Sequence, residues 1–426
     1  MGYVSSTTCS AMEVESTCPP FNIRCRWLAG KFLLKSLSYS DHRIFDIYYS
    51  LYLNWRYVPK SMPVLSIIAH SISNFHQYII NSTKLPLYEQ SYDSLIFSPQ
   101  IHSDNKFLDL SSNDFKSMSS SSVNAAVLNY LNERFLNFIA IYTDGSVSPL
   151  SAGYAFYIPD LQLSFNNNLP PTSSSFTAEC YAITEALKLI QNLPPNNYLI
   201  VSDSMSCLQA LNSNPFNSHL SPLILRIKSL IFTLNQTNYN IHFLWVPSHT
   251  GIHGNEVADH LAKSSSNLIF PSISQLPHSD FTSLIKQYST NIWFSLWNNL
   301  PAEFASRYRN ITPNILKKTW FNNLYLHRPY IVQFNRLRIG HHLLPSHSFK
   351  LGLNDSPFCT LHLNECICDL SHILLDCPAL QLNRIILINE LKTLNIPLNI
   401  HSILNTKSTT AIKLIISFIL DAGFII

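Results

Sequence analysis

Apolar positions along the middle of the chain alternate over lengths typical of β-strands. Residues 137–143, 152–158 and 162–166 are separated by short turns, a pattern that predicts an antiparallel meander. Two further apolar runs, at 198–202 and 241–246, predict buried strands. We therefore expect five strands in this part of the chain.

Helical periodicity appears between and after these strands. Apolar residues spaced three, four, seven and eight apart predict a helix over 177–192, which Pro194 and Pro195 end. Further helices are expected at 204–211, 220–234 and 255–263.

By this pattern the chain divides into three regions. Residues 1–137 contain helical stretches and a Ser/Asn-rich linker near 111–122, and carry no candidate chemistry. Residues 138–265 hold the predicted strands and helices, and residues 266–426 are expected to be mostly helical. A length of 426 residues also favours two or three units over a single domain.

Four carboxylates occupy positions where apolar residues are expected. Asp144 and Asp203 each end a strand pattern on its apolar face, Glu179 heads the apolar stripe of its helix, and Asp259 lies among Ala and Leu. A lone Asp at a strand end more often serves a turn. Four inward carboxylates, with almost no Lys or Arg nearby in the sequence, instead predict a divalent metal ion.

Four short motifs in this region resemble those of the ribonuclease H family. They read Tyr-Thr-Asp-Gly-Ser at 142–146, Phe-Thr-Ala-Glu at 176–179, Val-Ser-Asp-Ser at 201–204 and Trp-Val-Pro-Ser-His-Thr-Gly-Ile-His-Gly-Asn-Glu-Val-Ala-Asp at 245–259. Their order and their places at element boundaries extend the resemblance over about residues 137–263. It implies an α/β fold in which a mixed five-stranded sheet is flanked by helices, with a metal site at the sheet's centre.

The resemblance also implies an activity. Such a domain would hydrolyse the RNA strand of an RNA/DNA hybrid with two Mg²⁺ (or Mn²⁺) ions about 4 Å apart, which activate water and stabilise the leaving oxygen. Asp144 would bridge the ions, Glu179 and Asp203 would complete one site, and Asp259 would complete the other.

Other polar residues of the 245–259 motif receive roles from the same resemblance. His249, ten residues before Asp259, would transfer a proton to the leaving group or assist product release. Asn255 would contact the RNA strand, which this family reads through its 2′-OH and groove shape. His253 is expected to be a surface residue, and Glu185 and Glu256 to be solvated helix charges.

Charge is distributed unevenly, although the net charge of +3 is ordinary. Charged residues make up only 12% of the chain, about half the usual share. Residues 138–263 carry seven acids and four bases, whereas residues 264–426 carry thirteen bases and eight acids, a balance of +5. Attraction of a phosphate backbone is therefore expected from the C-terminal region, while the acidic middle would depend on metal ions.

A cluster of Cys and His between residues 359 and 377 is the second candidate for chemistry. Its short spacings are typical of zinc sites. With residues 336–341, it is similar to the tail that follows ribonuclease H in non-LTR retrotransposon polyproteins, where it usually starts Cys-x-x-Cys. Here His362 occupies the second position, and incidental reduced thiols are the alternative reading. The ligand set stays open between Cys359, His362, His372 and Cys377 and a set in which Cys366 or Cys368 replaces His362.

The stretch at 19–37 looks like the segment between reverse transcriptase and ribonuclease H in such elements, yet the sequence has no Tyr/Phe-x-Asp-Asp polymerase motif. We therefore expect the C-terminal portion of a retrotransposon polyprotein with an active ribonuclease H. A non-catalytic, zinc-stabilised nucleic-acid-binding remnant is the alternative, and an integrase-like or resolvase-like nuclease is third.

No secretory signal is visible at the N-terminus, and the most apolar run, 411–426, is too short to span a bilayer. Nine cysteines, an odd number without a signal peptide, favour reduced thiols. These features predict an intracellular protein of the nucleus or cytoplasm that is neither secreted nor bound to a membrane.

Overall fold

The computed structural model divides into two compact units, Arg26–Lys286 and Met1–Cys25 together with Gln287–Ile426. These boundaries differ from those of the three regions expected from the sequence, because the two ends of the chain belong to one unit. Most of the predicted linker near 111–122 lies outside the described residues. The structure describes residues 8–39, 43–54, 73–80, 93, 96–103, 118–214, 221–265, 275–301 and 304–426.

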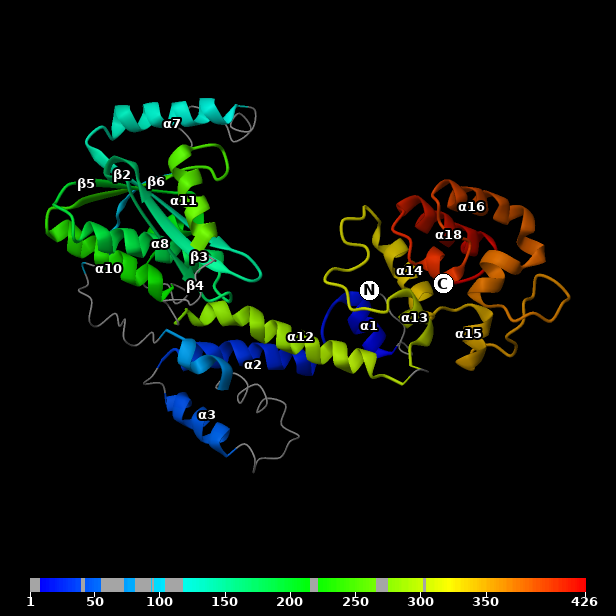
Figure 1. Cartoon of the computed structure of the whole chain (residues 1–426). Helices are drawn as coiled ribbons and strands as arrows, with labels where there is room; N and C mark the ends of the chain where they lie inside the picture. Colours follow the sequence, from blue (N-terminus) through cyan, green and yellow to red (C-terminus); the bar gives the residue numbers. More distant parts are fainter. Residues whose placement is uncertain are drawn as a thin grey trace. The chain divides into compact units, whose positions relative to one another are not determined.

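A mixed six-stranded sheet forms the centre of unit Arg26–Lys286 (Figure 1). Its order is β1-β6-β5-β2-β3-β4, with β2, β3 and β4 antiparallel and β1, β6, β5 and β2 parallel. The predicted α/β fold, a mixed sheet flanked by helices, is confirmed. The strands are β1 (Gln100–His102), β2 (Phe138–Val147), β3 (Ala152–Ile158), β4 (Leu163–Leu169), β5 (Asn197–Ser202) and β6 (Asn240–Trp245).

One strand was not expected. β1 comes from the N-terminal region and pairs in parallel with β6, with Gln100 opposite His242. It has only three residues, too few for an alternating pattern to be recognised in the sequence. The sheet therefore has six strands rather than the expected five.

Helices cover both faces of the sheet (Figure 1). On one face, α8 (Ser175–Ile190) and α10 (Pro222–Gln236) form the main core with one set of strand residues, including Ile200 of β5. On the other face, α7 (Ser120–Arg134) and α11 (His253–Ser264) pack with the alternate set, including Val201. This alternation is the period-two pattern of a strand buried on both sides.

Segments before and after the sheet complete the main core. The C-terminal part of α2 (Phe21–Leu37) contributes Leu34, residues 75–80 contribute Phe75 and Ile79, and the start of α12 (Thr282–Asn298) contributes Ile285. The remaining elements of this part of the chain are α3 (Arg43–Leu53), the 3₁₀ turns His76–Tyr78, Pro159–Leu161 and His278–Phe281, and α9 (Met205–Leu211).

The second unit is mostly helical, as expected from the sequence. Its core is formed largely by α18 (Thr409–Asp421), where Ile412, Ile415 and Ile419 are buried. None of the described helices has both the length and the apolar character needed to cross a bilayer. The other α-helices described in this unit are α1 (Cys9–Ser16), α13 (Ser306–Ile311), α14 (Arg328–Ile339), α15 (Pro345–Lys350), α16 (Gln381–Thr393) and α17 (Ile400–Leu404), and short helical turns lie at His372–Asp376 and Pro378–Leu380.

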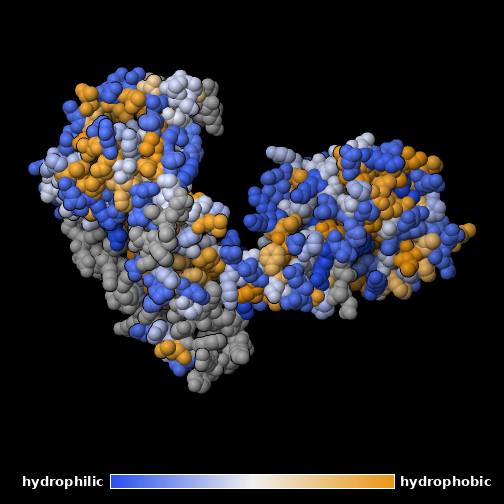
Figure 2. Space-filling model, viewed as in Figure 1, coloured by the Kyte–Doolittle hydropathy of each residue, from blue (hydrophilic) through white to orange (hydrophobic). Residues whose placement is uncertain are grey.

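Hydrophobic side chains also reach the surface of this unit. Figure 2 shows them over the part where α16 and α18 lie, and Leu382 and Ile386 of α16 are largely exposed. This agrees with the low charged fraction of the chain, since a surface with few charged residues exposes more apolar ones.

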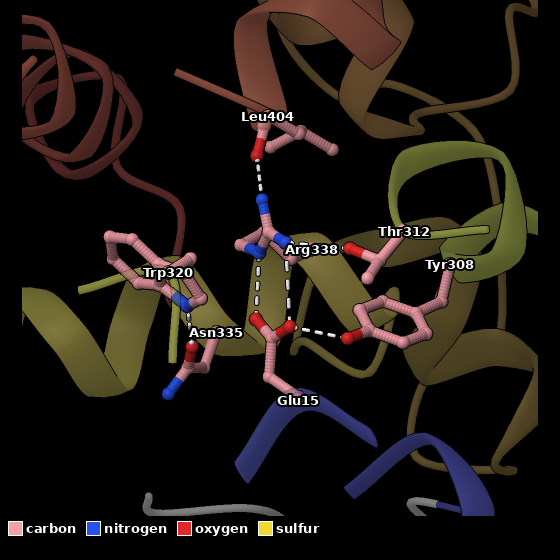
Figure 3. A network of polar contacts seen from close by, with 7 residues as sticks. All are labelled: Glu15, Tyr308, Thr312, Trp320, Asn335, Arg338 and Leu404. Atoms are coloured by element: carbon pink, nitrogen blue, oxygen red, sulfur yellow. Dashed lines mark hydrogen bonds and ion pairs between the residues drawn. The ribbon is translucent and has the colours of Figure 1, made fainter. Parts of the chain in front are cut away.

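A buried network of polar contacts joins α1 to the C-terminal helices (Figure 3). Arg338 of α14 donates to Glu15 at 2.7 Å and to Thr312 at 2.9 Å, and Nη1 donates to the carbonyl oxygen of Leu404. Tyr308 donates to the second oxygen of Glu15 at 2.5 Å. Arg338 is thus buried, and it is not among the bases of the C-terminal region that could attract a phosphate backbone at the surface.

Candidate active site

The parallel strands β2 and β5 are neighbours in the sheet, and they bring two of the predicted carboxylates together toward their carboxyl ends. Asp144 lies in β2, and Asp203 directly follows β5. Glu179 reaches the same place from the first turns of α8. One carboxylate oxygen from each of these three residues lies within 4.8 Å of the other two.

Gly145 allows α8 to approach β2 this closely. A Cβ at this position would lie 2.4 Å from the backbone nitrogen of Glu179 and 2.6 Å from the carbonyl carbon of Ala178. The Gly145 N–H also bonds to the Glu179 carboxylate, which lowers the pKa of that carboxyl against the larger effect of burial. Glycine is therefore required here by space rather than by backbone conformation.

The carboxylates of Asp144 and Glu179 are buried, and neither forms an ion pair with a described residue. These side chains belong to residues that are 5% and 6% exposed, and Asp144 Oδ2 and Glu179 Oε2 have no hydrogen-bond partner in the described part of the chain. Burial, with Asp203 and Asp259 nearby, raises the pKa of Asp144 to about 7. Burial and then Asp144 raise the pKa of Glu179 well above its usual value. Orphaned hard oxygen atoms at such a site fit a divalent metal ion.

Asp259 lies on α11 and belongs to a second group. One ligand atom from each of Asp259, His249 and Glu256 lies within 4.8 Å of the others. Lys263, one turn further along α11, pairs with Asp259 at 2.5 Å. The expectation that almost no base lies near the four acids is therefore wrong for Asp259, because helical spacing brings Lys263 onto its face.

The environment of Glu256 differs from the solvated one expected. Its side chain is half-buried, and its Oε1 accepts the N–H of Gly251 at 3.1 Å. The spacing of three between Glu256 and Asp259 on one helix was the sequence signal that could have placed them together. Glu185 is a helix charge paired with Lys188 at 2.7 Å.

The loop between β6 and α11 presents His249 to solvent. This residue has a φ of 53°, in the left-handed region. Burial raises the pKa of Asp203, while a hydrogen bond from Asn255 and the nearby His249 oppose that rise. The side chain of His249 therefore lies near the carboxylate of Asp203.

Asn255 is buried beside Asp203 rather than exposed at the surface. It is 2% exposed, and its Nδ2 donates to Asp203 Oδ2 at 3.2 Å. Such burial does not suit the predicted contact with an RNA strand, and it favours a role in holding Asp203. His253 is exposed, as expected.

Helix α7 holds in place the loop of residues 246–252, which carries His249 and is called the histidine loop below. The sequence did not indicate this role of α7. Asn124 Oδ1 accepts the backbone N–H of His253 at 2.9 Å. Gly251 has a φ of 85°, and a Cβ there would lie 2.2 Å from Cβ of Ser120. Val123 belongs to the same apolar cluster as Val246 and Ile252 at the two ends of the loop.

The Cys/His cluster of the second unit converges to four ligand atoms. Atoms of Cys359, His362, His372 and Cys377 all lie within 4.8 Å of one another. The two sulfur atoms are 4.0 Å apart, and the two Nε2 atoms are 3.1 Å apart. Of the alternatives left open by the sequence, this set includes His362 and leaves out Cys366 and Cys368.

A family profile supports the interpretation of residues 137–267 as a ribonuclease H domain. The profile of the RNase H family matches residues 137–267. The crystal structure of RNase H1 from the halophilic archaeon Halobacterium salinarum NRC-1 is similar at 19% identity, covering 30% of this chain and 96% of that chain with a TM-score of 0.25. No match was found among the curated proteins.

Proposed function

Residues 137–267 form a domain of the ribonuclease H family, and we propose that this domain cleaves the RNA strand of RNA/DNA hybrids. The observation that carries the proposal is the meeting of Asp144, Glu179 and Asp203, where Asp144 Oδ2 and Glu179 Oε2 are buried and have no hydrogen-bond partner among the described residues. Phosphodiester hydrolysis at such a site requires cations to neutralise the acids before a phosphate can approach.

Two Mg²⁺ (or Mn²⁺) ions would supply activation of water and stabilisation of the charge on the leaving 3′ oxygen. Asp144, Glu179 and Asp203 would hold one ion, and Asp144 together with Asp259 would hold the other. Lys263 pairs with Oδ2 of Asp259, so a cation held by that oxygen would compete with the Lys263 ammonium group.

The roles of the other polar residues at the site follow from their contacts within the chain. His249, exposed on its loop beside Asp203, would give a proton to the leaving oxygen. Asn255 orients Asp203 through its amide and is therefore a positioning residue. Glu256, bonded to the Gly251 N–H, would keep the histidine loop close to α11. We expect recognition of the hybrid through its shape and the 2′-OH rather than through base identity.

The test is incubation of the purified full chain with a labelled hybrid and Mg²⁺, beside duplex DNA and single-stranded RNA. Only the hybrid should be cut, and Asp144→Asn should lower the rate by orders of magnitude, because it removes charge but keeps shape. Asp160→Asn, at an exposed aspartate of the same domain, is the matched control. Equal cutting of duplex DNA would indicate an integrase-like or resolvase-like nuclease. Binding without cutting would indicate the non-catalytic alternative.

We further propose a structural zinc ion at Cys359, His362, His372 and Cys377. Tetrahedral zinc with ordinary bond lengths places two sulfur ligands ~3.8 Å apart and two nitrogen ligands ~3.3 Å apart. The measured separations, 4.0 Å and 3.1 Å, are close to these values. Together with the ribonuclease H domain, this cluster supports an origin in a non-LTR retrotransposon polyprotein.

Elemental analysis of protein purified without chelators should find one zinc ion per chain. Cys359→Ser should abolish it and loosen the C-terminal unit, because metal binding contributes folding free energy directly. Cys366→Ser is the control, since Cys366 lies outside the ligand set. Hybrid binding should also weaken when zinc is lost, most visibly at higher salt. Zinc retained by Cys359→Ser, or lost equally in both variants, would contradict the assignment.

A further inference from the structure

Three histidines and an arginine gather near the end of α14 in the second unit. His341 and His342 follow Gly340, which ends α14, and His347 lies in α15. The ring centroid of His347 is 4.8 Å from that of His341 and 5.6 Å from that of His342. Arg307 of α13 lies against the same place, because a Cβ on Gly340 would be 3.3 Å from its Cδ.

His342 offers a hydrogen-bond donor that nothing in the described chain accepts. Its residue is 2% exposed, and its Nδ1 accepts the backbone N–H of Leu344 at 3.3 Å. A neutral imidazole carries one N–H, so the proton lies on Nε2. Nε2 is buried and has no partner among the described residues. Burial, with Arg307 next in effect, lowers the pKa of His342 to about 3, which keeps the ring neutral.

Two neighbouring groups also have no hydrogen-bond partner among the described residues. Nε2 of His347 is buried and unpartnered in the described part of the chain. Arg307 is half-buried and has no hydrogen bond or ion pair to a described residue, and burial lowers its pKa. Asp369 attracts Arg307 electrostatically without forming an ion pair with it, and Oδ1 of Asp369 accepts the backbone N–H of His372 at 2.9 Å.

The arrangement is held by the surrounding backbone. The N–H of Ser346, at the start of α15, donates to the carbonyl oxygen of Cys368 at 3.1 Å. Gly340 has a φ of 82°, which turns the chain so that His341 and His342 follow directly from α14. The positions of His342 and His347 are therefore set by α14, by the hydrogen bond from Leu344 to His342 and by the Cys/His loop.

The chemistry of these groups excludes a metal cation and selects an anion. A metal would need the lone pair of His342 Nε2, which is occupied by a proton because Nδ1 already accepts. Arg307 would also repel a cation. The Nε2–H of His342, beside a guanidinium and an imidazole of His347 that can place its own proton on Nε2, instead matches the oxygen atoms of a phosphate group, which Arg binds in a forked geometry.

We propose that Arg307, His342 and His347 form a binding site for a phosphate group, supplied either by the backbone of a nucleic acid or by free inorganic phosphate. The site lies in the unit that does not contain the carboxylates, and it is independent of the proposed cleavage. A nucleic acid held there would be bound without regard to sequence, since phosphate contacts carry no base information.

The first experiment measures thermal unfolding of the full chain in inorganic phosphate, against chloride at equal ionic strength. Phosphate should raise the Tm of the wild type in a saturable manner and should not do so for Arg307→Gln. Lys350→Gln is the control, because it removes one positive charge close to His347 without removing a proposed ligand. Long-range ¹H–¹⁵N spectra of the imidazoles should show protonated Nε2 in His342, and its signal should shift with phosphate.

The second experiment distinguishes the two sources of phosphate. Anisotropy of a labelled DNA duplex, measured over a series of salt concentrations, gives the slope of log K against log salt. Arg307→Gln should reduce that slope by about 0.9 if it loses one backbone phosphate contact. An unchanged slope with a lost phosphate effect would assign the site to free phosphate. If Arg307→Gln does not fold, His347→Asn takes its place. A variant that responds to phosphate and to DNA like Lys350→Gln would overturn the proposal.

Discussion

At the scale of single residues, the carboxyl of Asp144 links the stability of the sheet unit to pH. Its pKa in the folded chain is raised to about 7 from an ordinary value of 3.8, first by burial and then by Asp203 and Asp259. The folded state therefore binds this proton more tightly than the unfolded state. Without metal, the free energy of unfolding should therefore fall as pH rises from the ordinary pKa of 3.8 to the folded-state pKa of about 7. The decrease should be on the order of a few kcal/mol.

Asp144→Asn should remove most of this dependence and be more stable than the wild type at pH 8 in excess chelator. Urea unfolding at pH 5 and pH 8 measures it, with Asp160→Asn as the exposed control. Glu179, whose pKa burial also raises, contributes in the same direction and leaves a residual slope. If the free energy of unfolding depends on pH as steeply in Asp144→Asn as in the wild type, burial of the Asp144 carboxylate is not the cause of the pH dependence.

At the scale of elements, α7 determines where the histidine loop lies. Asn124 holds the first residue of α11 through one hydrogen bond of 2.9 Å. Asn124→Ala should cost about 0.5–1.5 kcal/mol for that bond. It should also lower kcat several-fold with little change in KM, because His249 would be less well held during proton transfer.

Hybrid cleavage measured over a range of pH checks this role. The rate of Asn124→Ala should change with pH differently from the rate of the wild type, because the proposed proton donor is less well held in the variant. Asn129→Ala, exposed on the same helix, should match the wild type. If Asn124→Ala loses stability but keeps both kcat and the pH profile, α7 is only a structural cover of the sheet.

At the scale of the whole molecule, α1 belongs to the fold of the C-terminal unit. Glu15 and Arg338 form a buried ion pair at 2.7 Å that joins segments more than 300 residues apart in the sequence. Glu15→Gln should cost roughly 3–5 kcal/mol, since it leaves the guanidinium buried without a counter-charge. Denaturant unfolding followed by tryptophan fluorescence measures it, and Glu13→Gln on the same helix is the control, because Glu13 has no ion pair among the described residues.

The division into units also sets the shortest chain that should cleave a hybrid. Asp280 accepts hydrogen bonds from Ser174 at the start of α8, and Phe281 and Ile285 are buried in the main core. A chain of residues 21–298 should therefore fold and remain active. A chain of residues 21–263 should be less stable by about 1.5–3 kcal/mol for each buried side chain lost. Equal melting temperatures of the two would show that the sheet domain ends near Lys263.

The sequence alone determined the elements and the residues that carry the candidate chemistry. Strand alternation, helical periodicity and the misplaced acids are local features, because each depends on neighbours a few residues away. For this reason the sheet and its flanking helices could be predicted, together with the candidates Asp144, Glu179, Asp203 and Asp259. The Cys/His cluster could be found in the same way, although its spacing left the ligand set open.

Only the tertiary structure decided which groups meet across the chain. The edge strand β1, the hold of α7 on the histidine loop and the ion pair of Glu15 with Arg338 all join distant segments, and no local pattern marks them. The packing also places the side chain of Asn255 against Asp203, and it leaves Nε2 of His342 and of His347 without a hydrogen-bond partner in the described part of the chain. Burial and hydrogen bonding are properties of the packed chain, so spacing in the sequence cannot state them.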